Sequence, residues 1–226
     1  MGPNIIKYFF LTAILQVNQS KEKHSGSGAT GNSTDNWPQF RGPDGQGDAP
    51  TANLALSWSE EEHVTWKFTG PGEGWSSPVV DDRRIWMTTA CDIGRSLPAL
   101  CLDLKSGKLM KDLEVFYVDT LHDKNSMNSY ASPSPLIAEG KLYVHFGTYG
   151  TACMASGTGE ILWKRSDLKL NHEVGPGSSP VIWHDNLIIP SDRKDVQYII
   201  AISTSTGDVT RWHHLNLFKK FDTFEF

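Results

Sequence analysis

The motif Ser77-Pro78-Val79-Val80 recurs as Ser134-Pro135-Leu136-Ile137 and again as Ser179-Pro180-Val181-Ile182. The prolines of successive copies are 57 and then 45 residues apart. After each copy, a short polar stretch leads to a second apolar run. These runs are Ile85-Trp86-Met87, Leu142-Tyr143-Val144 and Leu187-Ile188-Ile189. Two apolar runs joined by a polar turn are typical of a β-hairpin, so the sequence predicts three related hairpins.

A Ser/Thr-Gly pair follows each hairpin. The pairs are Ser106-Gly107, Thr158-Gly159 and Thr206-Gly207. Glycine adopts the positive φ of a hairpin turn without steric cost, so each pair predicts a second hairpin in its unit. Trp163 follows Gly159, and His63-Val64-Thr65-Trp66 is similar to the stretch that carries it. We interpret Trp66 as part of the last strand of an earlier, incomplete unit.

Each unit therefore has four predicted antiparallel strands in about 40 to 50 residues, which is typical of a β-propeller blade. We expect blades over residues 75–116, 130–165 and 176–212, in an all-β partial propeller that begins with one leading strand. An outer-strand tryptophan, Trp66 or Trp163, is expected to form a flat plate between neighbouring blades. A β-sandwich with evenly spaced hairpins is the alternative. Three units with two landmarks in the same order favour the propeller.

The composition is that of an ordered chain without affinity for nucleic acid. Of 226 residues, 38% are hydrophobic, which is enough for a core and excludes global disorder. The net charge of −5 is spread along the sequence, and no basic block is present. Residues 21–36 are polar and are predicted to be a disordered linker. Residues 213–226 match no blade and are predicted to be an irregular tail.

Residues 1–20 have the pattern of a secretory signal peptide. Lys7 precedes an apolar run from Tyr8 to Leu15, and a polar stretch follows. The run is too short for a stable membrane span, which takes about 20 residues. We therefore expect export to the periplasm or the cell envelope. A buried N-terminal strand is the alternative for this segment.

Five further motifs indicate a family. They are Trp37-Pro38-Gln39-Phe40-Arg41-Gly42-Pro43, Gly74-Trp75-Ser76-Ser77-Pro78, His122-x-Lys124-Asn125-Ser126, Phe146-Gly147-Thr148-Tyr149-Gly150-Thr151 and His172-Glu173-Val174-Gly175-Pro176-Gly177. Together with the Ser/Thr-Gly turns they resemble the pyrroloquinoline-quinone-like (PQQ-like) β-propeller repeat proteins of the quinoprotein alcohol dehydrogenase-like superfamily, particularly secreted bacterial members and an outer-membrane assembly factor. The resemblance implies a ring of seven or eight blades. Three blades leave such a ring open, so further blades or a second chain would have to close it.

The resemblance leaves the function open, because this scaffold serves both quinoprotein dehydrogenases and non-catalytic proteins. A PQQ-dependent dehydrogenase would need an Asp base, oxygen ligands for Ca²⁺ and usually two adjacent cysteines. Cys91, Cys101 and Cys153 are never adjacent, and we predict that they are small core residues. A disulfide or a ligand role is the alternative. We predict no catalytic residue, metal ligand or cofactor, and PQQ and Ca²⁺ enter only under the enzyme alternative.

Six polar residues lie in the two connections between units. His122, Lys124 and Asn125 lie in the first connection, and Asn171, His172 and Glu173 lie in the second. Such connections gather on one face of a propeller, so these residues could form a small-ligand or metal pocket at the central channel. The alternative, which we favour, is that they cap strand ends and bind backbone groups of the loops.

The sequence therefore favours a non-catalytic, exported propeller scaffold that presents one face to a protein or an envelope polymer. The alternatives are a fragment of a PQQ-dependent quinoprotein oxidoreductase and an inactive remnant.

Overall fold

The computed structural model describes residues 9–13, 36–49, 57, 59, 61–168, 174–192 and 197–215. The described chain is all-β apart from two single-turn 3-10 helices, η1 (Asp92–Gly94) and η2 (Gly147–Tyr149). Within these ranges, no helix has the length and apolar character needed to cross a bilayer.

Three four-stranded antiparallel sheets follow one another along the chain, and each is built from strands that are consecutive in sequence. Blade one contains β3 (Val79–Asp81), β4 (Arg84–Thr88), β5 (Ser96–Asp103) and β6 (Leu109–Tyr117). Blade two contains β7 (Leu136–Ala138), β8 (Lys141–His145), β9 (Thr151–Ala155) and β10 (Ile161–Arg165). Blade three contains β11 (Val181–Trp183), β12 (Asn186–Asp192), β13 (Gln197–Ser203) and β14 (Val209–Leu215). A two-stranded antiparallel sheet of β1 (Phe9–Ala13) and β2 (Trp66–Gly70) precedes them.

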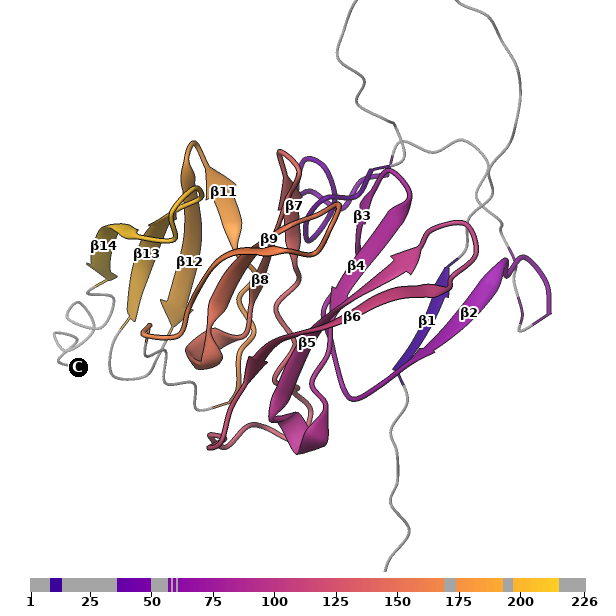
Figure 1. The fold of residues 1–226 in the computed structure, drawn as a ribbon, viewed down its shortest axis with the longest axis horizontal. Coiled ribbons are helices and arrows are strands. Elements are labelled where there is room, and N and C mark those ends of the chain that lie inside the picture. Colours follow the sequence, from indigo (N-terminus) through magenta and orange to yellow (C-terminus); the bar gives the residue numbers. More distant parts are fainter. Residues whose placement is uncertain are drawn as a thin grey trace, which may run out of the picture.

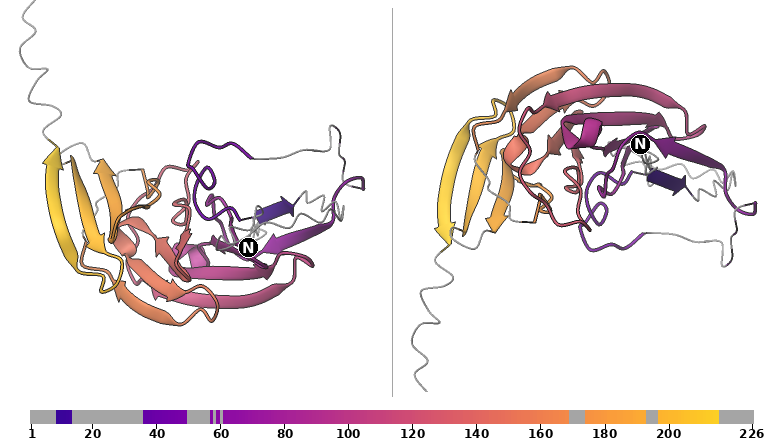
Figure 2. Two further views of the ribbon diagram at one scale, coloured as in Figure 1. Left: turned by 90° about the horizontal axis from the view of Figure 1, so that it is seen from above. Right: turned by 90° about the horizontal axis from the view of Figure 1, so that it is seen from below.

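The blades stand side by side along an arc, which is the arrangement of an open β-propeller (Figures 1 and 2). The last strand of each blade lies on the outside of the arc and the first strand lies on the inside (Figure 2). The predicted fold class, a partial propeller of four-stranded antiparallel blades, is therefore confirmed.

Three boundaries differ from the predicted ones. The leading strand β2 begins at Trp66 instead of ending there, because His63 has a φ of 62° and turns the chain. Strand β14 continues to Leu215, into the predicted tail, because the long strand β13 offers a partner for each residue from Arg211 to Leu215. Strand β1 lies within the predicted signal peptide and pairs with β2, and the signal peptide and the buried strand both stay predictions. Export itself stays a prediction.

Tryptophan side chains join the first and the last pair of neighbouring sheets. The ring of Trp66 covers Gly107 so closely that a Cβ added there would lie 2.3 Å from a ring atom. The ring of Trp163 covers Gly207 in the same way, at 2.8 Å. Each indole Nε1 also donates a hydrogen bond of 3.1 Å to a backbone carbonyl of the next blade, at Leu104 and Thr204. The predicted tryptophan plate is thus present at both junctions.

The junction of blades one and two is built without a tryptophan plate. Lys111 pairs with Cys101 as Trp163 pairs with Cys153, so a lysine takes the position of the plate. Leu113 covers the turn instead, with its Cδ1 atom 2.3 Å from a Cβ added at Gly159.

Hydrogen bonds connect the Ser-Pro motifs of successive blades. The backbone N–H of Ser77 donates to Oγ of Ser134 at 2.9 Å, and the N–H of Ser134 donates to Oγ of Ser179 at 2.9 Å. Ser134 and Ser179 therefore each satisfy a backbone group of the preceding motif. This contact explains why the motif recurs once per unit.

Clusters of buried apolar side chains fill the space between neighbouring sheets. The largest lies between blades one and two, around Trp86 and Leu142. A second cluster between blades two and three contains Cys153 and Leu187, and a third joins β2 to blade one. Most of the hydrophobic stabilisation therefore lies at the junctions, as in other repeat architectures.

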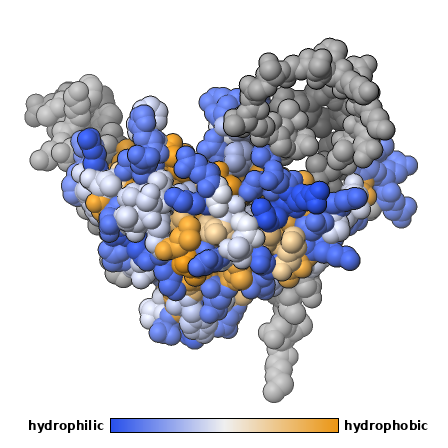
Figure 3. All heavy atoms as spheres, turned by 45° about the horizontal axis from the view of Figure 1, so that its top comes forward, coloured by the Kyte–Doolittle hydropathy of each residue, from blue (hydrophilic) through white to orange (hydrophobic). Residues whose placement is uncertain are grey.

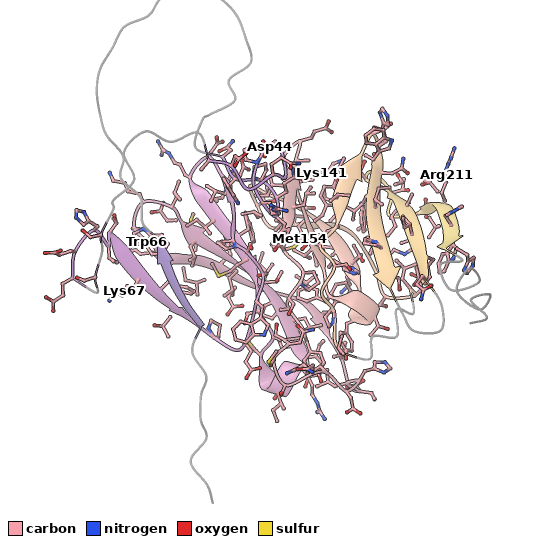
Figure 4. The ribbon with its side chains drawn as sticks, turned by 180° about the vertical axis from the view of Figure 1, so that it is seen from behind. Asp44, Trp66, Lys67, Lys141, Met154 and Arg211 are labelled. Atoms are coloured by element: carbon pink, nitrogen blue, oxygen red, sulfur yellow. The ribbon has the colours of Figure 1, made fainter. Side chains whose placement is uncertain are left out.

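Residues 36–49, which include the Asp44 labelled in Figure 4, lie on the inner side of the arc (Figure 2). Trp37 and Val80 exchange backbone hydrogen bonds of 3.1 and 2.8 Å, and the N–H of Ile137 donates to the carbonyl of Pro38 at 2.7 Å. The Trp37 segment, residues 36–38, therefore lies across the inner edges of both β3 and β7.

Candidate functional site

The connections between blades lie together on one side of the molecule, which we call the loop face. It carries η1, η2 and the connections after β6 and β10, at the bottom of Figure 1. The opposite side, the hairpin face, is largely covered by hydrophilic residues with apolar groups visible between them (Figure 3). Loops on a rigid β scaffold are common binding sites, so the loop face is the candidate site.

A cavity of about 600 Å³ opens on the loop face between blades one and two. It is lined by residues 116–120 at the end of β6 and just after it, by His122, by Thr148 and Tyr149 of η2, and by residues 164–166 at the end of β10. Its walls therefore come from the outer strands and from η2, away from the inner strands that face the axis of the arc. Its volume lies within the range of small-ligand sites.

The two cations in the wall of this cavity are engaged with the protein itself. Arg165 donates to both carboxylate oxygens of Asp167, at 2.9 and 2.7 Å, and to the carbonyl of Gly207. Lys164 donates to the carbonyl of Val115 at 3.4 Å, and its Nζ lies 5.6 Å from the ring centroid of Phe116. These charges fix the end of β10 against its neighbours and are not directed at an open site.

Of the predicted site residues that the structure describes, only His122 lines the cavity. Its side chain is exposed, and its backbone is held on both sides. The N–H of His122 donates to the hydroxyl of Tyr149 at 2.9 Å, and the hydroxyl of Tyr130 donates to the carbonyl of His122 at 2.8 Å. Burial raises the pKa of both tyrosines, so both hydroxyls stay protonated at neutral pH.

Lys124 and Asn125 bind backbone groups of their own loop. The Nζ of Lys124 donates to the carbonyl of Asn128 at 2.7 Å, and the Oδ1 of Asn125 accepts from the N–H of Met127 at 2.9 Å. These contacts favour the capping interpretation for both residues. Asn171, His172 and Glu173 lie outside the described residues, so a ligand pocket formed by all six stays a prediction.

The two connections nevertheless meet. The N–H of Asn125 donates to the carbonyl of Val174 at 3.2 Å. The Nδ2 of Asn128 donates to the same carbonyl at 2.8 Å and to that of Pro176 at 3.2 Å. The loop face is therefore one continuous surface across blades one to three.

Large apolar side chains on the loop face are exposed to solvent, which the sequence analysis did not predict. Ile93 is 92% exposed, Met127 is 85% exposed and Val174 is 58% exposed. Tyr117 and Trp75 are also more than half exposed. The Asp-Ile-Gly sequence of η1 predicts a turn, but it does not predict that the isoleucine is exposed.

The cysteines are free thiols, and two of them lie in the core as predicted. Cys101 and Cys153 are fully buried, and burial raises the pKa of each to about 11 from an ordinary value of 9.0. Cys91 is half-buried, and burial together with the nearby charge of Asp112 raises its pKa as well. Because thiolates are the reactive form, none of the three is activated as a nucleophile.

This arrangement predicts slow labelling of the native thiols. At pH 8, a disulfide reagent such as DTNB should leave Cys101 and Cys153 unmodified in the folded protein and label all three cysteines in urea. Because the folded pKa lies above the unfolded one, the stability contribution of these two thiols is complete below pH 9.0 and is lost as the pH rises towards about 11. Rapid native labelling of both residues would contradict their burial.

Nowhere in the described part of the chain do three or more His, Cys, Asp or Glu side chains gather at a distance suited to a metal ion. Calcium takes six to eight oxygen ligands. No reaction step through PQQ or Ca²⁺ therefore follows from the described residues.

The structure of this chain is similar to parts of several solved structures. No protein-family model and no curated protein matches the sequence. BamB from Moraxella catarrhalis matches with a TM-score of 0.47 and 14% identity, over 67% of this chain and 43% of that chain. Quinohemoprotein alcohol dehydrogenase from Comamonas testosteroni matches with a TM-score of 0.47 and 14% identity, over 63% of this chain and 21% of that one.

The chain is similar in part to BamB and to a quinohemoprotein alcohol dehydrogenase. A europium-containing methanol dehydrogenase matches as well, with a TM-score of 0.45 and 15% identity over 61% of this chain. The chain covers 24% of that enzyme, so it spans less than half the length of each of these three proteins. At this identity the likeness concerns the fold, and the resemblance expected from the motifs is present.

Proposed function

We propose that this chain is a section of a non-catalytic, exported β-propeller that docks a partner protein at the cell envelope through its loop face. The exported location rests on the signal-like pattern of residues 1–20. The docking role rests on the loop face, and above all on Ile93.

Ile93 is both exposed and held in an unfavourable backbone conformation. Its φ is 60°, in the left-handed region that β-branched residues rarely adopt. The conformation costs roughly 1–2 kcal/mol. It is maintained by its surroundings: Asp92 accepts a 3.0 Å hydrogen bond from the hydroxyl of Tyr117, and the ring of Tyr130 packs directly against Gly94. Strained residues of this kind cluster at functional sites.

The chemistry of the face indicates what it binds. The cationic and amide groups of Lys124, Asn125 and Arg165 are engaged with the protein, whereas the apolar groups of Ile93 and Met127 are directed to solvent. A surface with exposed apolar side chains fits a protein partner with a complementary apolar pocket.

The experiment compares Ile93→Asp with Met110→Asp as bait in cross-linked envelope extract of the source organism. Met110 is a matched control because it is 54% exposed but lies near the start of β6, at the end of the strand away from the loop face. We expect Ile93→Asp to lower the recovery of a specific partner about tenfold or more, as for an interface hot spot. Equal recovery with both variants would contradict docking through the loop face, as would recovery of polysaccharide in place of protein.

A third variant tests the strain independently of any partner. Ile93→Gly should stabilise the free protein by about 1 kcal/mol, because glycine adopts the positive φ at no cost. Urea unfolding measures the change. A loss of stability would mean that Ile93 contributes to the fold, and the functional interpretation of its strain would be wrong.

A further inference from the structure

The inner edges of blades one and two are covered by a piece of the chain itself. Trp37 of the Trp37 segment pairs with Val80 of β3 through two hydrogen bonds, and Pro38 accepts the N–H of Ile137 in β7 at 2.7 Å. An extended segment at a sheet edge satisfies backbone groups that would otherwise remain open to other chains.

Strand β11 of blade three presents the same edge. Val80, Ile137 and Ile182 hold equivalent registers, since they pair with Ile85, Leu142 and Leu187 in their second strands. The N–H of Val80 and that of Ile137 point outward to the Trp37 segment, so the N–H of Ile182 points outward as well. Among the residues that the structure describes, none donates to or accepts from Ile182 on this side.

The side chains that flank this edge are apolar and exposed. Val181 is 50% exposed, whereas its equivalents Val79 and Leu136 are 0% and 3% exposed because side chains of the following blade pack against them. Trp183, on the same side of the strand as Val181, is 68% exposed. The edge of β11 therefore offers a backbone group that an added strand could pair with. Next to it, Val181 and Trp183 offer an apolar surface that every second side chain of such a strand could contact.

We propose that the inner edge of β11 binds an extended segment of a partner protein by strand addition. The segment pairs with the backbone of Ile182 and places an aromatic or aliphatic side chain against Trp183. The contact that the Trp37 segment makes with β3 and β7 is the precedent within this chain, with two backbone hydrogen bonds at β3 and one at β7. This surface is separate from the loop face and does not depend on the docking proposed there.

The test uses a synthetic peptide with the sequence of residues 36–43, added to the ¹⁵N-labelled full chain. We expect chemical-shift changes and slower exchange at the amide of Ile182. The amides of Val80 and Ile137 should not change, because their positions are already occupied. No change at Ile182 up to millimolar peptide, or a change only at Val80 and Ile137, would overturn the proposal.

Two variants make the test specific. Ile182→Pro removes the outward N–H and is compatible with an edge strand, so it should weaken peptide binding about tenfold while the melting temperature stays near that of the wild type. Trp183→Ala should also weaken binding, and it keeps the test decisive if the proline variant does not fold. Trp212→Ala, on the opposite edge of the same blade, is the matched control.

Unchanged binding in Ile182→Pro, or equal effects of Trp183→Ala and Trp212→Ala, would contradict strand addition at β11. The variant Ile93→Asp should bind the peptide normally. Failure of this proposal is therefore distinguishable from failure of the docking proposed for the loop face.

Discussion

Replacing Gly107 with alanine should destabilise the protein by about 2–5 kcal/mol. Two effects combine in this estimate. Gly107 has a φ of 68°, where a Cβ costs roughly 1–2 kcal/mol. The new Cβ would also lie 2.3 Å from the ring of Trp66, and overpacking of this kind typically costs about 1–3 kcal/mol. Urea unfolding, followed by tryptophan fluorescence, measures the loss.

Gly140 provides the matched control. Its φ is 72°, nearly that of Gly107, but no atom lies within 4 Å of a Cβ placed there. Gly140→Ala should therefore show the backbone cost alone, roughly 1–2 kcal/mol. Equal losses of stability in the two variants would mean that the ring of Trp66 does not lie over the turn. The described packing between β2 and blade one would then be contradicted.

Replacing Trp163 with alanine should cost about 3 kcal/mol, near the lower end for a tryptophan because the side chain is only half-buried. The substitution removes the plate over Gly207 and the contact with Tyr143, whose ring centroid lies 6.2 Å away. It also removes the hydrogen bond to the carbonyl of Thr204. The loss should appear as a lower midpoint of urea unfolding.

The control for Trp163→Ala is Trp183→Ala. Trp183 is 68% exposed, so its loss should change the free energy of unfolding by no more than about 0.5 kcal/mol. A small loss of stability in Trp163→Ala, similar to that of the control, would contradict the packing of Trp163 between blades two and three.

The repeat could be predicted because its landmarks are set by local chemistry. A turn that needs positive φ requires glycine at 107, 159 and 207, and a hairpin requires two apolar runs. The plates at Trp66 and Trp163 follow from their distance to these turns. The substitution of Lys111 and Leu113 at the middle junction could not be predicted, because the repeat spacing does not show which side chain fills a gap of given shape.

The site was predicted less well than the fold. The sequence placed His122, Lys124 and Asn125 on the face that carries the connections, and the structure shows that two of these side chains bind their own loop. The exposure of Ile93 depends on packing of Tyr117 and Tyr130 from distant parts of the chain, which one sequence does not reveal. The contact of the Trp37 segment with β3 and β7 could not be predicted either, because it joins residues that are far apart in the sequence.

The most direct test of the blade arrangement is the proton NMR spectrum of the turn glycines in the full chain. The rings of Trp66 and Trp163 should shift the Hα resonances of Gly107 and Gly207 upfield and give nuclear Overhauser contacts to them, with Gly140 as the unshifted reference. Random-coil shifts at Gly107 and Gly207, without contacts to either indole, would contradict the stacking of successive units as propeller blades.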